Sequence, residues 1–418
     1  MPAGGCCDAK QMFWSPIAVT LKSYEDHVPM KRVWVHLIVA TEDFKLAGQP
    51  RVGFPILLWE DMSSCQQANE FLRYYLLRGA IGSSKSWEPT GRAMYDYFGF
   101  LEAHDLSWDD VDRGEAKTLV AAYRDYCFEA ARLARNTIRQ RLLYVCAFYV
   151  FAKRKGWVKT LPYEYEERQV IQSGGFLAHV EASGSKQAVQ SVMPRKHRDL
   201  VKFLSRDQVK ALLAATDNPH HHTMIRFAVQ SGLRREELAS FPLAYVIDPD
   251  KTGGVERNVR LNLDPADGTG MKTKGGKPRT IYISRRLMRD LHLYTIHYRG
   301  QRASLKPVAP KTLFLNQSGE PWAADGKGIE AMVRKVGRKA GIRTHPHMLR
   351  HTYATHTLMA LQRHRGDKRI EPLVFLQRQL GHSSIQTTMS YLHLVNELAD
   401  DAVLAYDDEL NDWLGEPT

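Results

Sequence analysis

The sequence is organised around one stretch near its C-terminal end, Leu380-Gly381-His382-Ser383-Ser384-Ile385-Gln386-Thr387-Thr388-Met389-Ser390-Tyr391. A Gly-His pair comes just before two serines that can begin a helix, and Tyr391 then falls on that helix between a polar and an apolar face. Because a helix N-terminus favours anions, His382 is placed to donate a hydrogen bond to a phosphate. A lone tyrosine on a helix is more often a packing residue than a nucleophile, so the role of Tyr391 depends on what the rest of the chain supplies.

The chain of 418 residues is basic, with a formal net charge of +12. Its length and its 44% hydrophobic content predict two or three folded domains. The charge favours a polyanionic partner such as nucleic acid. No apolar run approaches the roughly 18 residues that a membrane-spanning helix needs, and residues 1–10 lack the pattern of a secretory signal. We therefore expect a cytoplasmic protein that binds nucleic acid and no membrane.

The sequence contains no pattern typical of a metal or cofactor site. Its five cysteines are scattered, without a CxxC pair or zinc-ligand spacing. The triplet His220-His221-His222 is adjacent in sequence, so its rings cannot all face one ion on a regular helix. The glycine-rich run 270–277 does not have the GxxxxGK[ST] spacing of a nucleotide loop. We expect neither a metal nor a cofactor.

The first part of the chain divides into three segments. Residues 1–60 form an N-terminal extension with short strands near 33–39 and 52–59, and residues 61–172 have helical periodicity. Helices are expected from residue 66 and over 87–104, 114–133 and 136–155, the last with Asn136 as its N-cap. The basic edge of that last helix suits phosphates, although a solvated helix face explains it equally well. Residues 173–199 are rich in Gly, Ser and basic residues and predict a basic interdomain linker.

A second domain is expected over 200–395, followed by an acidic tail over 396–418. Ser205 and Gln208 have the spacing of a capping box, and a helix is expected over 222–230. Extended segments at 257–263 and 279–284 are joined by the Gly-rich stretch 267–278, and helical patterns dominate afterwards. The fold is therefore expected to be mainly α with a small β-sheet, making this an α+β domain. Residues 392–418 contain eight Asp or Glu residues and no Lys or Arg, so we expect this end to contact protein rather than DNA.

The side chains of this second domain can carry phosphodiester chemistry. Cleavage without water needs a nucleophile, donors for the nonbridging oxygens and an acid for the departing oxygen. Arg234 and Arg350 suit the oxygens, because a planar guanidinium binds two of them at once and stays charged. Arg234 alone would more often be a salt-bridge partner of Glu236 or Glu237. His347 precedes Arg350 by three positions, hence on the same helix face, and its imidazole can accept the tyrosine proton.

Five separated motifs together resemble the tyrosine recombinase family, also called phage integrases. They are GLRREEL at 232–238, KGGKPR at 274–279, HMLRHT at 347–352, LGH at 380–382 and Tyr391, and the resemblance covers roughly residues 200–395. It implies that Tyr391 attacks phosphorus to form a 3′-phosphotyrosyl bond, with Arg234, His347, Arg350 and His382 around the phosphate. It favours Lys274 as the acid for the leaving 5′ oxygen, while Lys272 and Lys277 remain close alternatives. His351 is assigned no catalytic role.

The resemblance also implies a function and an assembly. The expected activity is site-specific recombination through a Holliday junction, by a homo-tetramer on synapsed double-stranded DNA, with room for accessory proteins. A helical core-binding domain, all-α over 61–172, and the catalytic domain would form a C-shaped clamp. One departure is the polar insert 363–369, which predicts an extended loop. Two alternatives are a type IB topoisomerase, which relaxes supercoils without exchanging partners, and a noncatalytic DNA-binding accessory protein.

Overall fold

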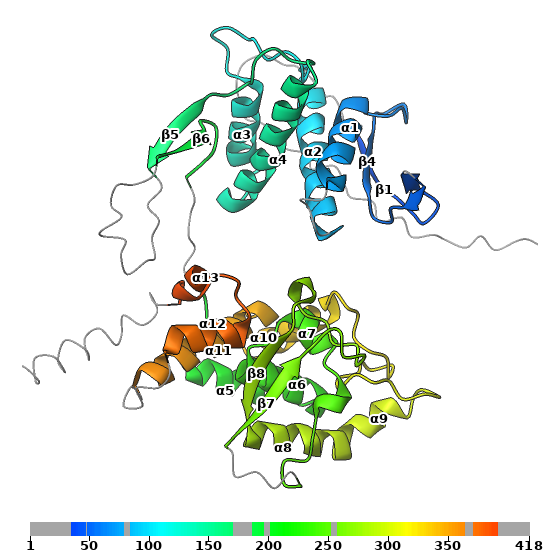
Figure 1. Cartoon of the computed structure of the whole chain (residues 1–418), viewed down its shortest axis with the longest axis vertical. Helices are drawn as coiled ribbons and strands as arrows, with labels where there is room; N and C mark the ends of the chain where they lie inside the picture. Colours follow the sequence, from blue (N-terminus) through cyan, green and yellow to red (C-terminus); the bar gives the residue numbers. More distant parts are fainter. Residues whose placement is uncertain are drawn as a thin grey trace, which may run out of the picture. The chain divides into compact units, whose positions relative to one another are not determined.

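The computed structural model describes residues 35–46, 48–78, 84–169, 186–195, 201–251, 257–363 and 371–391. The chain folds into two compact units, Met1–Arg198 and Asp199–Thr418 (Figure 1). In the part of the chain so described, helices dominate and the strands form small two-stranded sheets, which confirms a mainly α fold with little β-structure. The expected loop at 364–369 and the acidic tail at 396–418 lie outside the described residues. The division into five segments stays a prediction.

The first unit combines a β-hairpin with four main helices. Strands β1 (His36–Val39) and β4 (Pro55–Leu58) pair antiparallel, with His36 opposite Leu58. The other elements, in chain order, are β2 (Lys45–Leu46), β3 (Gln49–Pro50), α1 (Gln66–Leu77), η1 (Ser84–Ser86), α2 (Trp87–Ala103), α3 (Leu119–Glu129) and α4 (Arg135–Arg154). The predicted helices are present with shifted ends. Asn136 is not the cap of α4, because Ala134 occupies that position and no side chain caps the helix.

The hairpin shares the hydrophobic core of the helices. The side-chain amide of Asn69 on α1 donates to the carbonyl of Leu57 at 2.7 Å and accepts from its N–H at 2.8 Å. Gly91 on α2 allows close packing, since a Cβ there would lie 2.3 Å from Pro55. Phe54 and Leu57 are buried in the same cluster as the helix residues. The short strands expected in the N-terminal extension therefore belong to the first unit's core.

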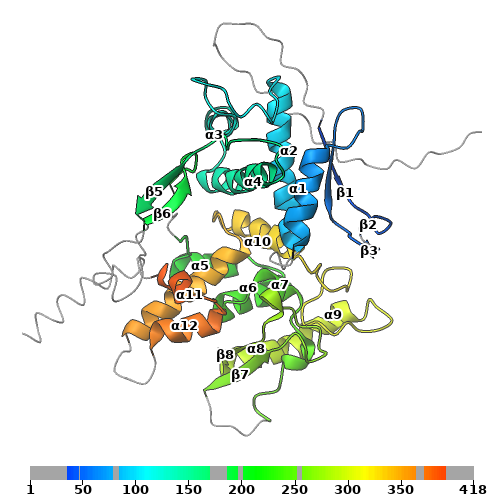
Figure 2. The same ribbon diagram turned by 45° about the horizontal axis from the view of Figure 1, so that its top comes forward.

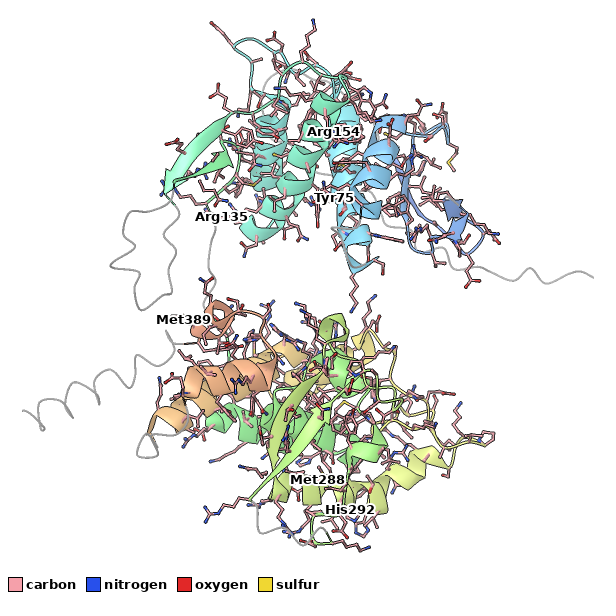
Figure 3. All side chains as sticks on the ribbon, viewed as in Figure 1. Tyr75, Arg135, Arg154, Met288, His292 and Met389 are labelled. Atoms are coloured by element: carbon pink, nitrogen blue, oxygen red, sulfur yellow. The ribbon has the colours of Figure 1, made fainter. Side chains whose placement is uncertain are left out.

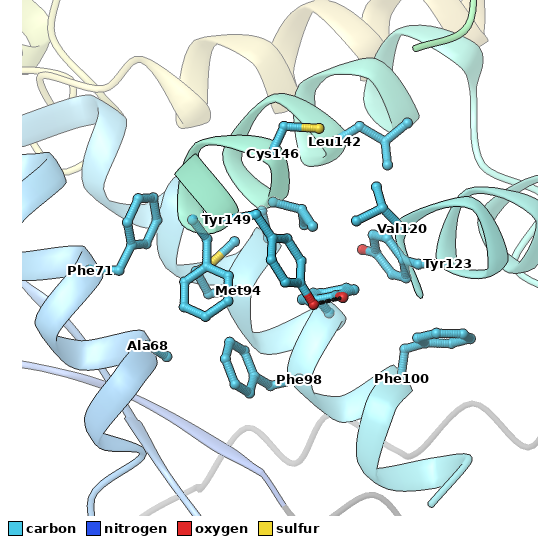
Figure 4. Packing of buried hydrophobic residues seen from close by; sticks show 14 of the residues in the cluster. Ala68, Phe71, Met94, Phe98, Phe100, Val120, Tyr123, Leu142, Cys146 and Tyr149 are labelled. Atoms are coloured by element: carbon cyan, nitrogen blue, oxygen red, sulfur yellow. Dashed lines mark hydrogen bonds between the residues drawn. The ribbon is translucent and has the colours of Figure 1, made fainter. Parts of the chain in front are cut away.

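The core of the first unit is aromatic and contains buried thiols. Figure 4 shows Phe98, Tyr123 and Tyr149 among the side chains that meet there. The hydroxyls of Tyr97 and Tyr149 are 2.6 Å apart, and Tyr149 also donates to the carbonyl of Trp108 at 2.8 Å, so these polar ends are satisfied inside the core. Burial raises the pKa of Cys146 to about 12. This thiol is therefore a small apolar packing group, as the sequence predicts.

Part of the predicted linker is folded onto the first unit. Strand β5 (Tyr165–Gln169) pairs antiparallel with β6 (Lys186–Gln190), and Met193 is buried just after the hairpin. Arg168 donates to the carbonyl of Met193 at 2.8 Å, and Arg139 on α4 donates to the carbonyl of Pro194. The structure thus differs from a structureless linker over 186–195. Because β5 lies within 61–172, the expectation of an all-α domain is not confirmed.

Several basic residues of α4 have partners within the protein. Arg141 forms an ion pair with Asp96 at 2.6 Å, and Lys155 pairs with Glu70. Arg154 donates to the hydroxyl of Tyr74 at 2.8 Å and lies over its ring (Figure 3). These contacts explain part of the basic edge as internal structure rather than as a phosphate-binding surface.

The second unit carries one β-hairpin among helices. Strands β7 (Asn258–Leu263) and β8 (Arg279–Ser284) pair antiparallel, close to the predicted bounds. The remaining elements are α5 (Arg206–Ala214), α6 (Pro219–Ser231), α7 (Arg235–Ala239), η2 (Leu243–Tyr245), η3 (Lys274–Gly276), α8 (Arg285–Tyr294), η4 (Thr295–Arg299), α9 (Gly300–Ala303), α10 (Lys327–Lys339), α11 (Pro346–Arg363), α12 (Pro372–Leu380) and α13 (Ile385–Met389). The predicted capping box of Ser205 and Gln208 is present at the start of α5.

Packing in this unit brings the ends of α6 and α12 together around α11. Helix α11 packs against both α6 and α12 (Figure 2). Helix α12 is also fixed to strand β8, because the side-chain amide of Gln379 donates to the carbonyl of Tyr282 and accepts from its N–H, both at 2.9 Å. The side chain of Gln379 therefore pairs with the strand as a neighbouring strand's backbone would. No helix in the described part of the chain combines the length and the apolar character needed to cross a bilayer.

Candidate active site

Arg350 lies at the centre of the candidate site. Its side chain on α11 is 2% exposed, and its two terminal nitrogens donate to the carbonyl of Gly232 at 2.6 Å and to that of Leu380 at 2.5 Å. These carbonyls end α6 and α12, so the guanidinium connects three helices. Burial, followed by the charge of Arg234, lowers the pKa of Arg350 to about 9. The group stays charged at neutral pH while its orientation is fixed.

Arg234 approaches from α7 and is held by a buried carboxylate. It donates to Glu237 Oε1 at 3.0 Å and to the carbonyl of Gly381 at 2.9 Å. Glu237 is 1% exposed and also accepts from Arg279 on β8 at 2.8 Å. The ion pair that the sequence suggested as the ordinary role of Arg234 is therefore present. It also aims the guanidinium, because Glu237 fixes Arg234 from one side while Gly381 fixes it from the other.

The carboxylate of Glu237 makes the stability of this unit pH-dependent. Burial would raise its pKa, but hydrogen bonding and charge from Arg279 and then Arg234 outweigh this and lower the pKa from 4.5 to about 2. A carboxylate with a depressed folded pKa contributes stability above its unfolded pKa and loses it as pH falls through the folded value. We expect Glu237→Gln to be less stable at pH 7, and its deficit to shrink by on the order of 3 kcal/mol between pH 6 and pH 2. Denaturant unfolding of both full-length proteins across this range measures the difference; parallel curves would contradict it.

Two glycines with positive φ shape the carbonyl ends that the arginines use. Gly232 has φ +68°, and a Cβ there would lie 2.4 Å from the ring of Tyr353. Gly381 has φ +63°, and its Cβ would lie 2.6 Å from the side chain of Arg279. Gly341 has nearly the same backbone, with φ +67°, but open space at the Cβ position.

Gly341→Ala is accordingly a matched control for Gly232→Ala. Both substitutions place alanine in the left-handed region, which costs about 1–2 kcal/mol. Only Gly232→Ala also forces a side chain into Tyr353, and overpacking of that kind costs a further ~1–3 kcal/mol. We expect thermal or denaturant unfolding to show the larger loss for Gly232→Ala. Equal losses would mean that the contact with Tyr353 relaxes freely.

Tyr391 is buried against histidines. It follows α13 directly, rather than lying within the helix as the sequence suggested, and Met389 in Figure 3 marks the end of that helix. The phenol oxygen is 2.8 Å from Nδ1 of His351, and the tyrosine is 2% exposed. Burial raises the pKa of Tyr391, while the charges of Arg350 and Arg234 oppose the rise. The two arginines therefore favour the phenolate at this position.

His382 lies on the other side of the tyrosine ring. It occupies the connection between α12 and α13, where its Nδ1 is 3.0 Å from the hydroxyl of Thr388. Its ring is parallel to that of Tyr391, with centroids 6.4 Å apart. Burial and then Arg350 lower the pKa of His382 to about 3, so the ring is neutral at physiological pH.

Lys274 and His347 complete the predicted set. The ring of His347 is 4.2 Å from that of His351, and burial and then Arg350 lower the pKa of His347. The charge of Lys274 adds to this lowering, so the lysine lies within electrostatic range of His347. Lys274 begins η3 between β7 and β8 and is exposed. The main chain of Lys272 donates to Ser240 and that of Lys277 accepts from Thr273, contacts that do not concern their ammonium groups.

The combined electrostatics are those of an anion site. Arg350 lowers the pKa of each of the histidines His347, His351 and His382, and it lies close enough to Arg234 for the two positive charges to disfavour one another. A bound phosphate would relieve this repulsion and accept hydrogen bonds from both guanidinium groups. The site is thus arranged for a tyrosine beside a phosphate.

His351 was missed as a functional residue, although a signal for it was present. It follows His347 by four positions, so both rings share one face of α11. His220, by contrast, is a structural histidine, since its Nδ1 is 3.0 Å from the hydroxyl of buried Tyr294. The described residues include no group of three His, Cys, Asp or Glu side chains that could hold a metal ion.

Known proteins resemble this chain over both units. Residues 202–397 match the model of the Phage integrase family. Tyrosine recombinase XerD of Caulobacter vibrioides is 27% identical over 325 residues, which cover 73% of this chain and 85% of the relative.

Two solved structures have the same fold. The XerH site-specific recombinase, in a post-cleavage complex with palindromic difH substrate, gives a TM-score of 0.52 at 14% identity, covering 82% of this chain and 88% of that one. The Tn1549 transposon integrase, in complex with transposon right end DNA, gives a TM-score of 0.52 at 17% identity, covering 78% of this chain and 93% of that one. With the sequence match added to this shared fold, the chain belongs to the tyrosine recombinase, or phage integrase, family of site-specific recombinases.

Proposed function

We propose that this recombinase cleaves and rejoins DNA with Tyr391 as its nucleophile. The observation that carries the proposal is the position of the phenol oxygen, 2.8 Å from His351 and in the field of Arg234 and Arg350. A tyrosine kept only for packing would not need cations that favour its ionised form. Attack by this oxygen on a phosphodiester forms a 3′-phosphotyrosyl bond and releases a 5′ hydroxyl, and reversal of the step rejoins the strand.

The other residues then take complementary roles. Arg234 and Arg350 hold the nonbridging oxygens of the phosphate, where negative charge develops as Tyr391 attacks. His347 and His382 flank the same oxygens, with His347 also available to accept the tyrosine proton. Lys274 gives a proton to the departing 5′ oxygen, and its charge already reaches His347. These roles account for the bond that forms, the bond that breaks and the proton on the leaving group.

Duplex DNA is the proposed partner, and a homo-tetramer on two synapsed sites is the proposed assembly. The net charge of +12 supports a polyanionic partner. XerH and the Tn1549 integrase, which share this fold, are described in complex with difH substrate and with transposon right end DNA. We propose that helices α1–α4 serve as the core-binding domain and that the two units close on DNA as a C-shaped clamp in the cytoplasm. Strand exchange through a Holliday junction follows from this arrangement, and accessory proteins would act on it.

Mapping of covalent junctions tests the function on DNA of every sequence at once. The full-length protein is incubated with sheared genomic DNA, adducts are isolated under denaturing conditions, and the attached 3′ ends are sequenced. A duplex carrying the mapped site, nicked close to the junction so that the released end diffuses away, then accumulates the adduct. We expect peptide mapping to place the DNA on Tyr391.

The same assay separates the two alternative functions. Adducts scattered over unrelated sequences, with relaxation of any supercoiled plasmid by the monomer, would indicate a type IB topoisomerase. Binding without any adduct would indicate an accessory protein. Clustered adducts, together with exchange between two copies of the mapped site, are the result that a recombinase gives.

A further inference from the structure

The hydroxyl of Tyr391 contacts His351, a residue with no part in the mechanism above. His351 follows Arg350 on α11, and its Nδ1 is 2.8 Å from the phenol oxygen. The two rings are 5.6 Å apart, and the tyrosine is buried between His351 and His382. His347, one turn earlier, contacts the ring of His351. A base must lie within hydrogen-bond reach of the proton that it removes, and His351 does.

We propose that His351 is a further catalytic residue, which accepts the proton of Tyr391 as the phenol oxygen attacks phosphorus. This inference rests on the proposed function and deepens it. In the step, the O–H bond of Tyr391 breaks and an N–H bond forms at Nδ1 of His351, while the new oxygen–phosphorus bond forms and the bond to the 5′ oxygen breaks. That oxygen takes its proton from Lys274. Religation reverses each transfer, so His351 returns the proton to Tyr391.

The charges around His351 couple this step to DNA binding. Burial and then the positive neighbours His347, Arg350, His345 and His382 lower its pKa to about 3. The free enzyme therefore holds a neutral but weak base next to a protonated phenol. A phosphodiester bound by Arg234 and Arg350 adds a negative charge, which raises the pKa of His351. Proton transfer thus becomes favourable when the substrate is in place.

The assignment leaves His347 a different role. Its ring contacts that of His351, and it lies in the field of both Arg350 and Lys274. His347 would then contact the phosphate and support the ring of its neighbour by packing. The two histidines on one face of α11 divide the work, one at the nucleophile and one at the phosphate.

A comparison of His351→Asn with His347→Asn tests the proposal. The asparagine amide can replace a hydrogen bond near the Nδ1 position but cannot take up a proton. On the nicked duplex at pH 7, we expect His351→Asn to form the adduct about 100-fold to 1,000-fold more slowly than wild type in a single turnover. Its rate should rise about tenfold per pH unit up to pH 9, because hydroxide replaces the base, whereas the wild-type rate should be nearly flat.

Two results would overturn the assignment. A His351→Asn rate within about threefold of wild type would mean that the histidine only positions the tyrosine. A pH-dependent rate in His347→Asn, with none in His351→Asn, would make His347 the base. Wild-type protein that forms no adduct would instead remove the proposed function itself, so the two failures are distinguishable.

A sulfur-substituted substrate locates the defect on the nucleophile side. A bridging 5′-phosphorothiolate leaves without an acid, so it should restore the rate of Lys274→Ala but not that of His351→Asn. Equal rescue of both variants would count against His351 as the base. Thermal unfolding and DNA binding of His351→Asn and His351→Ala establish that the loss occurs in folded, DNA-bound protein.

Discussion

Tyr391→Phe is expected to bind its DNA site with nearly wild-type affinity and to form no covalent adduct on the nicked duplex. The substitution removes only the hydroxyl and keeps the ring in its buried position beside His382. Its cost in stability should be about 1 kcal/mol, because a single hydrogen bond to His351 is lost. Adduct formation is followed by denaturing gel electrophoresis and binding by gel shift.

Tyr294→Phe provides a matched control for this experiment. It deletes a hydrogen bond of the same kind, from a buried tyrosine hydroxyl to Nδ1 of His220 at 3.0 Å, between α8 and α6. We expect a similar change in the free energy of unfolding and a wild-type rate of adduct formation. An adduct with Tyr391→Phe would show that another residue is the nucleophile.

Arg350→Ala is expected to lose cleavage by about 1,000-fold or more, with a much smaller loss in binding. Removal of one preorganised donor to developing charge typically costs about 100-fold to 1,000-fold. The alanine also leaves the carbonyls of Gly232 and Leu380 without the hydrogen bonds that now orient them. Arg350→Lys keeps the charge but not the two-pronged geometry, so it should retain binding and still cleave slowly.

Loss of stability must be separated from loss of catalysis in this variant. Arg302→Lys offers the comparison, since Arg302 is also a buried arginine that donates to a backbone carbonyl, that of Leu315. We expect Arg302→Lys to lower the unfolding temperature without changing the adduct rate of the folded protein. If cleavage and binding by Arg350→Ala fall equally, Arg350 is a DNA contact and not a catalytic group.

The local elements of the second unit were predictable because short-range chemistry determines them. The capping box at Ser205 and the paired strands on either side of the Gly-rich turn appear where the sequence placed them. The pairing of β5 with β6 was not predictable. Its second strand, KQAVQ, has little apolar alternation, and its position depends on Arg139 and Arg168, which reach carbonyls 55 and 25 positions away.

The candidate site divides in the same way. Motif spacing identified Arg234, Arg350 and Tyr391 as candidate residues, and the structure brings them into one electrostatic cluster. The contact between His351 and Tyr391 joins positions 40 apart in the chain, so it depends on how the end of α13 folds back over α11. Helix α4 shows the same limit, since Arg141 and Lys155 find acidic partners on other helices that periodicity does not reveal.

The main-chain carbonyls that hold the two arginines have a consequence for mutational tolerance. Gly232, Leu380 and Gly381 present peptide oxygens, which every residue type carries, so no side-chain replacement at these positions deletes the acceptor itself. Neutral drift can therefore change much of the surrounding sequence while the guanidinium groups keep their aim. What such drift cannot change is the path of the backbone, and that path depends on the two glycines. A recombinase built in this way can diverge widely from its relatives and retain the same reactive geometry.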